Sequence, residues 1–279
     1  MEPLLMATSG EAASLDPIAP TTLPDLTHAD ATFELDYTGA GIGTEDLGRT
    51  LTYMASMHGE VPLTTRAWHA GGAWEVVSAA AEGRGRALLY ANPELWVRGV
   101  GWHESGLSGG GGLGVVIPLP RDLGPEARSV QRTIRVIRPW DAPYFESSVL
   151  TLRPSVDARL VLAPFVLQLR QGIDWTYDFS RDRSDVVGRV GTYMGVAPAS
   201  FAMLGLELWQ TYAITKDVRD DERAAFTLSP SVRLRFGPIQ PGLSVLFPIS
   251  TPLEGIASEF FAVRIHLRLA LGKTAELGH

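Results

Sequence analysis

The sequence predicts an all-β protein that folds as one antiparallel up-and-down barrel of about 12 strands, within a range of about 10 to 14. Three observations lead to this prediction. From residue 149 onward, apolar and polar residues alternate with a period of two. The alternating segments run for 11 to 16 residues, and the connections between them alternate strictly between short uncharged turns and longer charged loops. Strands of this length, joined in sequence, favour a single closed sheet.

The N-terminal half has a weaker pattern. Residues 1–30 are rich in Ala, Pro and Thr and are expected to form a flexible tail. Leu47, Leu51, Met54 and Met57 have helical spacing, so over residues 46–57 a short helix competes with a strand. The remaining strands of this half are expected near residues 31–41, 62–70, 73–82, 86–102, 112–119 and 130–138.

The C-terminal half alternates clearly. In residues 149–162 the even positions are mostly apolar and the odd ones polar, and residues 165–179 show the opposite phase. The phase changes at Ala163 and Pro164, as a tight hairpin turn requires. Further strands are expected at residues 186–196, 200–215, 225–236, 240–250 and 259–271, followed by a C-terminal tail at 272–279.

Strand length and aromatic spacing place the apolar face in lipid rather than in a soluble core. Soluble strands usually have about 5–6 residues, fewer than any of these segments. Phe226 and Phe236 share a face ten residues apart, as do Phe165 and Trp175. At about 3.3 Å per residue and a tilt of about 40°, that spacing corresponds to about 25 Å, the height of the apolar band of a membrane barrel. The expected aromatic girdle consists of Phe165, Trp175, Tyr177, Tyr212, Phe226, Phe236 and Phe261.

The opposite face is rich in arginine. Of the 24 basic residues, 22 are arginine, and the two lysines lie in a loop and in the C-terminal tail. Guanidinium groups are well suited to a confined lumen, where several acceptors hold each one. Over residues 149–271, eight inward arginines face four carboxylates, 8 − 4 = +4. The expected lumen-lining residues, and therefore candidates for binding or selectivity, are Arg153, Asp157, Arg159, Arg170, Asp174, Asp178, Arg189, Glu207, Arg233, Arg235, Arg264, His266 and Arg268.

Together, these features resemble Gram-negative outer-membrane β-barrel proteins. The proline-bearing segments "GGLGVVIPLP" (111–120) and "PGLSVLFPIS" (241–250) are similar to those of small barrels grouped with channels for hydrophobic or aromatic compounds. The resemblance covers residues 31–271 and implies an integral protein of the bacterial outer membrane in contact with lipid. It also implies that the tight turns and both termini face the periplasm. The family's insertion signal ends in a C-terminal aromatic residue, whereas here the last strand ends at Leu271 and "GKTAELGH" follows.

Other classes of function find little support in the sequence. The net charge of −7 and the absence of a basic run argue against nucleic acid. The chain has no cysteine, and its six histidines have no metal-ligand spacing, so we expect no metal, cofactor or catalytic site and no enzyme. The glycines of residues 37–48 and 108–112 are better explained as a hairpin end and a loop than as phosphate-binding sites.

Two functions are compatible with such a barrel. One is a passive channel or transporter for small solutes with an arginine-rich lumen. The other is a closed structural barrel that anchors or assembles a protein complex of the cell envelope. A barrel of about 12 strands is close to the size at which side chains fill the interior, so the sequence leaves both open.

Overall fold

The computed structural model describes residues 31–44, 48–63, 67–81, 86–102, 106–119, 137–215, 223–250 and 259–271, and single positions between 120 and 136. The tails expected at residues 1–30 and 272–279 lie outside the described residues, as do most of the charged loops at 216–223 and 250–259. None of the helices in the described part of the chain is long and apolar enough to span a membrane.

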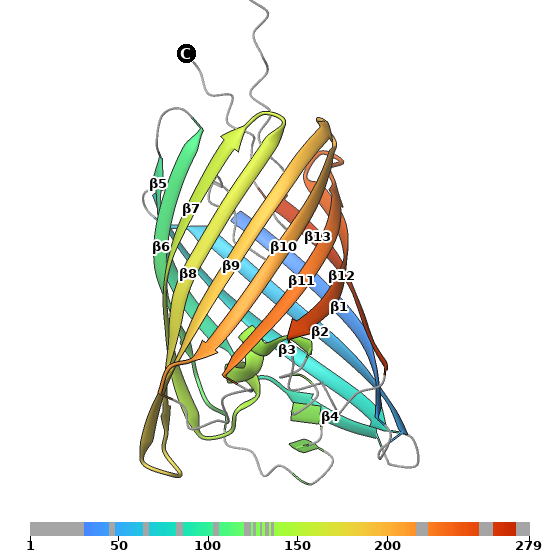
Figure 1. The fold of residues 1–279 in the computed structure, drawn as a ribbon. Helices are drawn as coiled ribbons and strands as arrows, with labels where there is room; N and C mark the ends of the chain where they lie inside the picture. Colours follow the sequence, from blue (N-terminus) through green and yellow to red (C-terminus); the bar gives the residue numbers. More distant parts are fainter. Residues whose placement is uncertain are drawn as a thin grey trace, which may run out of the picture.

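The protein is a closed antiparallel barrel with twelve strands in its wall (Figure 1). Each strand pairs with its neighbour in the sequence, except that β4 and β5 both pair with β3, and β1 pairs with β13 from Ala31↔Leu271 to Gly43↔Glu259 to close the sheet. The strands are β1 (Ala31–Thr44), β2 (Gly48–Pro62), β3 (Trp68–Ala81), β4 (Arg86–Tyr90), β5 (Glu94–Trp102), β6 (Leu107–Val116), β7 (Val149–Leu162), β8 (Phe165–Asp178), β9 (Arg183–Ala199), β10 (Ala202–Ala213), β11 (Ala224–Leu234), β12 (Ile239–Ser250) and β13 (Glu259–Leu271).

The fourth strand of the wall is broken into two pieces. The first half of β3 pairs with β5, and its second half pairs with β4. Between these pieces, residues 91–93 leave the extended pattern, where Pro93 has no amide hydrogen to give to a ladder. The expected single strand at 86–102 is therefore interrupted, and the preferred number of twelve strands is confirmed once β4 and β5 are counted as one.

Three further expectations for the N-terminal half change. Residues 48–62 form the strand β2, so of the two alternatives for residues 46–57 the strand is correct. The expected strand at 62–70 is wrong, because β2 ends at Pro62 and β3 begins at Trp68. The expected strand at 130–138 is also wrong: the described positions between 127 and 137 are helical, and a 3-10 helix, η1 (Pro139–Phe145), follows.

The two faces of the wall differ as a lipid-spanning barrel requires. Outward residues such as Val156, Leu167 and Ile265 are exposed, whereas inward Thr227, Ser229 and Arg233 are buried. An apolar exterior around a polar interior is the reverse of a soluble protein and matches a transmembrane barrel. The membrane face is therefore the outside of the sheet.

The connection between β6 and β7 folds into the barrel, where η1 lies toward the lower end in Figure 1. Its apolar residues are buried against the inner wall on two sides. Val130, Ile134, Tyr144 and Phe145 pack in one cluster with β2, β3 and β4. Ile137 and Trp140 pack in a second cluster with residues of β1, β10, β12 and β13, and Trp140 stacks on Trp209 at 5.1 Å. We call the described residues between 127 and 146 the inward segment.

Asn92 fastens the inward segment to the wall at the strand break. Its backbone amide donates to the carbonyl oxygen of Tyr144 at 2.6 Å, and its side-chain amide donates to those of Pro143 and Glu146 at 3.2 and 2.7 Å. Its side-chain oxygen accepts from the amide of Leu119 at 2.9 Å. The Asn92 side chain therefore provides hydrogen-bond partners for backbone groups that would otherwise be unpaired at the strand break and in the inward segment.

Candidate functional site

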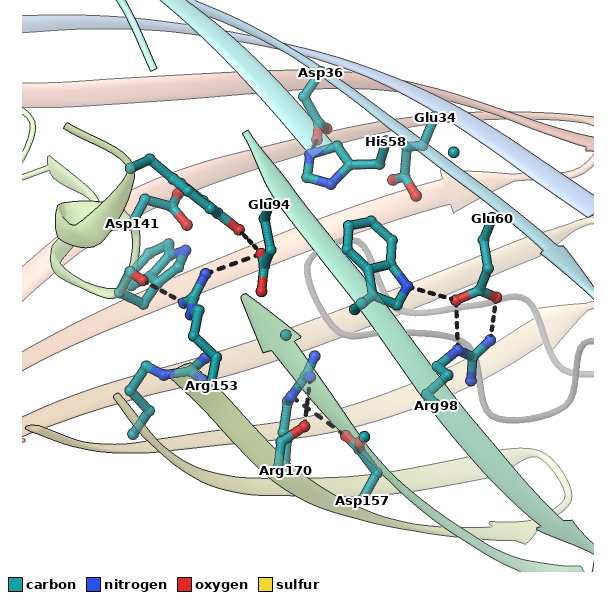
Figure 2. Close-up of a pocket in the computed structure, with 18 of the residues that line it drawn as sticks. Glu34, Asp36, His58, Glu60, Glu94, Arg98, Asp141, Arg153, Asp157 and Arg170 are labelled. Atoms are coloured by element: carbon teal, nitrogen blue, oxygen red, sulfur yellow. Dashed lines mark hydrogen bonds and ion pairs between the residues drawn. The ribbon is translucent and has the colours of Figure 1, made fainter. Parts of the chain in front are cut away.

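A cavity of about 190 Å³ lies inside the barrel, next to the inward segment (Figure 2). Its lining runs from Thr32, near the start of β1, to Trp140 and Tyr144 in η1. Seven guanidinium groups and six carboxylates line it, a difference of one positive charge. The cavity is a charged but nearly neutral chamber.

Most carboxylates of the lining come from strands of the N-terminal half and most guanidinium groups from strands of the C-terminal half, although β13 lies next to β1 in the closed sheet. Four of the six carboxylates belong to β1, β2 and β5, namely Glu34, Asp36, Glu60 and Glu94. Five of the seven guanidinium groups belong to β7, β8, β9 and β13, namely Arg153, Arg170, Arg189, Arg264 and Arg268. In Figure 2, Glu34 and Asp36 lie on one side of the cavity, and Arg153 and Arg170 lie on the other.

Arg153 links the two walls to the inward segment. Its Nη1 lies 3.1 Å from Glu94 Oε2, its Nε lies 3.1 Å from Asp174 Oδ1, and its Nη2 donates to the carbonyl oxygen of Trp140 at 2.8 Å. The guanidinium also lies over the ring of Tyr144, 5.0 Å from its centre, and the hydroxyl of Tyr144 donates to Glu94. A guanidinium held by this many acceptors is fixed in place.

The glycines of β6 allow side chains of β5 and β7 to make contact across this strand. Its inward positions 110, 112 and 114 are all glycine, so the side chain of Glu94 lies over this strand at Gly114 and reaches Arg153 on β7. Arg98 makes a bidentate pair with Glu60, with both distances at 2.5 Å, and the indole nitrogen of Trp96 donates to the same carboxylate at 3.1 Å.

On β8, the side chain of Arg170 is less buried than that of Arg153. Its Nη2 donates to Ser155 Oγ at 2.8 Å, and its Nε lies 3.7 Å from Asp157 Oδ1. Its side chain keeps 26% of its surface exposed, compared with 5% for Arg153. Arg170 therefore presents a charged edge to the open part of the cavity.

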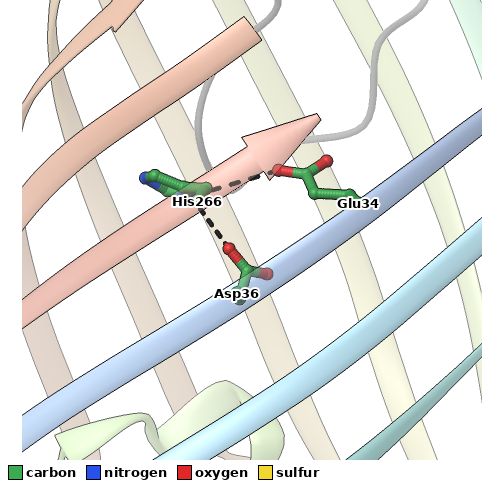
Figure 3. Close-up of side chains that lie close together, drawn as sticks. All are labelled: Glu34, Asp36 and His266. Atoms are coloured by element: carbon green, nitrogen blue, oxygen red, sulfur yellow. Dashed lines mark hydrogen bonds and ion pairs between the residues drawn. The ribbon is translucent and has the colours of Figure 1, made fainter. Parts of the chain in front are cut away.

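Glu34, Asp36 and His266 form the one group of possible metal ligands detected among the described residues, with ligand atoms within 4.8 Å of one another (Figure 3). Arg264 Nη2 lies 2.6 Å from Asp36, Arg233 Nη2 lies 2.8 Å from Glu34, and His266 Nδ1 lies 2.9 Å from Asp36. The arginines already compensate both carboxylates and would repel a cation, so the donor set fits an ion-pair network rather than a metal.

The structure places the expected lumen residues in three groups. Arg153, Asp157, Arg170, Arg189, Arg264 and Arg268 line the cavity. Arg159, Asp174, Glu207, Arg233 and His266 are buried in the interior outside its lining, and Arg235 is half-buried. Asp178 lies at the end of β8 and accepts hydrogen bonds from Ser180 in the next turn, so it belongs to the rim.

The expected girdle residues lie toward the ends of the strands. Phe165, Trp175, Tyr212 and Phe236 are exposed, and Tyr177 and Phe226 are half-buried. Phe236 lies just beyond β11, in an isolated bridge with Ile239. The side chain of Phe261 lies outside the described residues.

The carboxylates of the N-terminal half and the inward segment were not among the lumen residues expected from the sequence. Glu34 and Asp36 alternate with Phe33, Leu35 and Tyr37, so the same two-residue period that identified the arginines was present there. The residues of η1 had no comparable signal, because their burial depends on the walls that enclose them.

No family model and no curated protein match the sequence. Solved structures match the fold. The COG4313 outer membrane channel from Pseudomonas putida F1 superposes with a TM-score of 0.64 over 91% of this chain and 99% of that chain, at 9% identity. The fold is that of the outer-membrane β-barrels. The KdgM porin, solved in complex with disordered oligogalacturonate, covers 86% of this chain and 99% of its own, with a TM-score of 0.50 and 10% identity.

Proposed function

We propose that this barrel is a passive channel for small solutes in the bacterial outer membrane. The observation that carries the proposal is the polar cavity of about 190 Å³ inside a closed wall. A polar cavity of this size can hold several water molecules or one small solute. The similarity in fold to an outer membrane channel and to a porin supports the proposal. The proposal assigns no catalytic reaction to the barrel.

The charges of the lumen favour weak ion selectivity. The excess of four positive charges expected for residues 149–271 leaves out the carboxylates of β1, β2, β5 and η1. With these included, the cavity lining has an excess of one positive charge, and most of its arginines are ion-paired. A nearly neutral lumen gives little electrostatic preference to either sign.

A second function is favoured by the inward segment. Two apolar clusters and the hydrogen bonds of Asn92 hold it against the wall, and it occupies the half of the barrel opposite the tight turns. A barrel permanently closed in this way would serve as an anchor for a protein complex of the envelope. The two functions differ in whether the inward segment leaves a path for water.

Conductance of the purified protein in planar bilayers tests the proposal. We expect steady openings of low conductance with weak selectivity between potassium and chloride. We expect Asn92→Ala to increase and destabilise the current, because it removes the side-chain hydrogen bonds to Pro143 and Glu146 and loosens the inward segment, and Ser180→Ala in the exposed β8–β9 turn to behave like the wild type. Folded and inserted protein that stays silent, also as the Asn92→Ala variant, would reject the channel and favour the anchor.

A further inference from the structure

The outer surface of the barrel carries a small group of polar side chains on three neighbouring strands. Away from the strand ends, the outward positions of the described strands hold apolar residues, aromatic residues or glycine, with four exceptions. One exception is Ser78 on β3. The other three are Gln171, Thr192 and Gln210, which belong to β8, β9 and β10, side by side in the wall (Figure 1). Three of the four polar residues that face lipid therefore share one patch.

The two glutamines of this patch occupy one row across the sheet. Gln171 lies opposite Val190 in the β8–β9 ladder, and Val190 lies opposite Gln210 in the β9–β10 ladder. Opposite residues of antiparallel strands have Cα atoms about 5 Å apart, so the two glutamines are about 10 Å apart. Gln171 comes two positions after the exposed Leu169, and Gln210 two positions after the exposed Leu208, so both side chains point away from the lumen.

Both carboxamides lie between the expected aromatic girdles. Gln171 is four residues from Trp175 and six from Phe165, the exposed aromatic residues near the two ends of β8. At about 3.3 Å per residue and a tilt of about 40°, it is about 10 Å inside one girdle and about 15 Å inside the other. Gln210 is two residues from the exposed Tyr212 and therefore about 5 Å inside its girdle. Lipid tails at these depths offer neither donors nor acceptors.

The glutamines have no hydrogen-bond partner for their carboxamides within the part of the chain that the structure describes. The hydroxyl of Thr192 can donate to a backbone carbonyl of its own strand, whereas a carboxamide carries two donor hydrogens and an acceptor oxygen. A polar group left unpaired in lipid costs free energy, so hydrogen bonds to a neighbouring protein stabilise it. Between the glutamines, β9 presents Gly188 and Val190, whose small size lets another wall approach closely.

We propose that this patch is the interface of a homodimer in which Gln171 of each protomer makes hydrogen bonds with the partner's Gln210. A two-fold axis along the membrane normal, passing beside Val190, exchanges the β8 and β10 sides of the patch, so the same contact forms twice. Because a carboxamide both donates and accepts, two glutamines satisfy each other without a third group. The inference does not depend on the proposed channel function, and its tests measure no transport.

The reach of the side chains fits this arrangement. With strands tilted by about 40°, a row about 10 Å long brings Gln171 and Gln210 to depths that differ by about 6 Å. A rotation about the membrane normal preserves depth, so each contact between the protomers has to span this offset. With carbon–carbon bonds of about 1.5 Å, a glutamine extends about 4 Å beyond its β-carbon, and two side chains together cover the distance.

Association in lipid vesicles tests the dimer. Protein labelled through Arg181→Cys, in the exposed β8–β9 turn, with a donor or an acceptor dye is reconstituted over a range of protein-to-lipid ratios, and energy transfer is measured. We expect Gln171→Met, which keeps the length of the side chain but removes the amide, to need an about tenfold higher ratio for half association, because each dimer loses both contacts. Ser78→Ala removes a polar group from the lipid face elsewhere and should associate like the wild type.

Cross-linking locates the interface. We expect Val190→Cys, next to the proposed axis, to give covalent dimers with a short bismaleimide in vesicles. Met57→Cys is the control, because it is exposed on β2, six strands from β9 in either direction around the wall, and should stay monomeric. Heat-dependent mobility on gels verifies that each variant is folded.

Three results would overturn the inference. The first is a wild type that remains monomeric at every protein-to-lipid ratio. The second is folded Gln171→Met that associates as strongly as the wild type, which would mean that the amides reach the membrane interface instead of a partner. The third is cross-linking through Met57→Cys as efficient as through Val190→Cys, which would indicate crowding without a defined interface.

Discussion

At the scale of single residues, the absence of side chains at Gly112 and Gly114 is as important to the lumen as the charges. A β-carbon at Gly112 would lie 2.9 Å from both the β-carbon of Arg98 and the carbonyl oxygen of Val97. One at Gly114 would collide with the carboxylate of Glu94. A side chain at Gly114 would therefore displace Glu94 from its ion pair with Arg153, and one at Gly112 would push against the backbone of β5 at Val97 and Arg98.

We therefore expect Gly112→Ala to destabilise the barrel by about 1–3 kcal/mol, the usual cost of overpacking a close-packed site. The contact involves backbone atoms, which cannot turn away as a flexible side chain does. Gly39→Ala is the matched control, because its nearest neighbour would be Tyr53 at 3.8 Å, an ordinary contact distance. Urea unfolding in lipid vesicles measures both, and equal stability of the two variants would contradict the close approach at Gly112.

At the scale of one strand, depth in the membrane determines the cost of a charge. Ile265 lies at the centre of β13 and Leu271 at its end, on the same outward face and with similar exposure, 55% and 56%. Six residues at about 3.3 Å each, tilted by about 40°, separate them by about 15 Å along the membrane normal. The two positions therefore sample different depths with the same local geometry.

We expect Ile265→Arg to cost about 2–4 kcal/mol and Leu271→Arg about 0–1 kcal/mol, because the penalty decreases from the midplane to the interface. Folding titrations into lipid vesicles give both values. Equal costs at the two positions would mean that β13 does not cross an apolar layer in this orientation.

The whole barrel has two unlike ends. One carries the turns after β7, β9 and β11 together with the start of β1 and the end of β13, and the other carries the β8–β9 turn and the connection that forms the inward segment. By the resemblance to outer-membrane barrels, the first end faces the periplasm.

Single-cysteine labelling tests this orientation, since the chain has no cysteine of its own. We expect Arg181→Cys, in the exposed β8–β9 turn, to react with an impermeant maleimide on intact cells. Pro238→Cys, in the exposed turn between β11 and β12, should react only after the outer membrane is opened. The reverse labelling pattern would show that the barrel has the opposite orientation in the membrane.

The sequence alone determined the all-β class, the strands after residue 149 and the faces that they present to lipid and lumen, because a two-residue period is a local property of extended chain. It identified the arginines but not their partners. Arg264 meets Asp36 across 228 residues, and Arg153 meets Glu94 across 59. The closure of β1 onto β13 decides the first contact, and the pairing of β5, β6 and β7, with glycine at position 114 between them, decides the second. Pairing of this kind depends on which strands become neighbours, so the near-neutral cavity is a property of the tertiary structure.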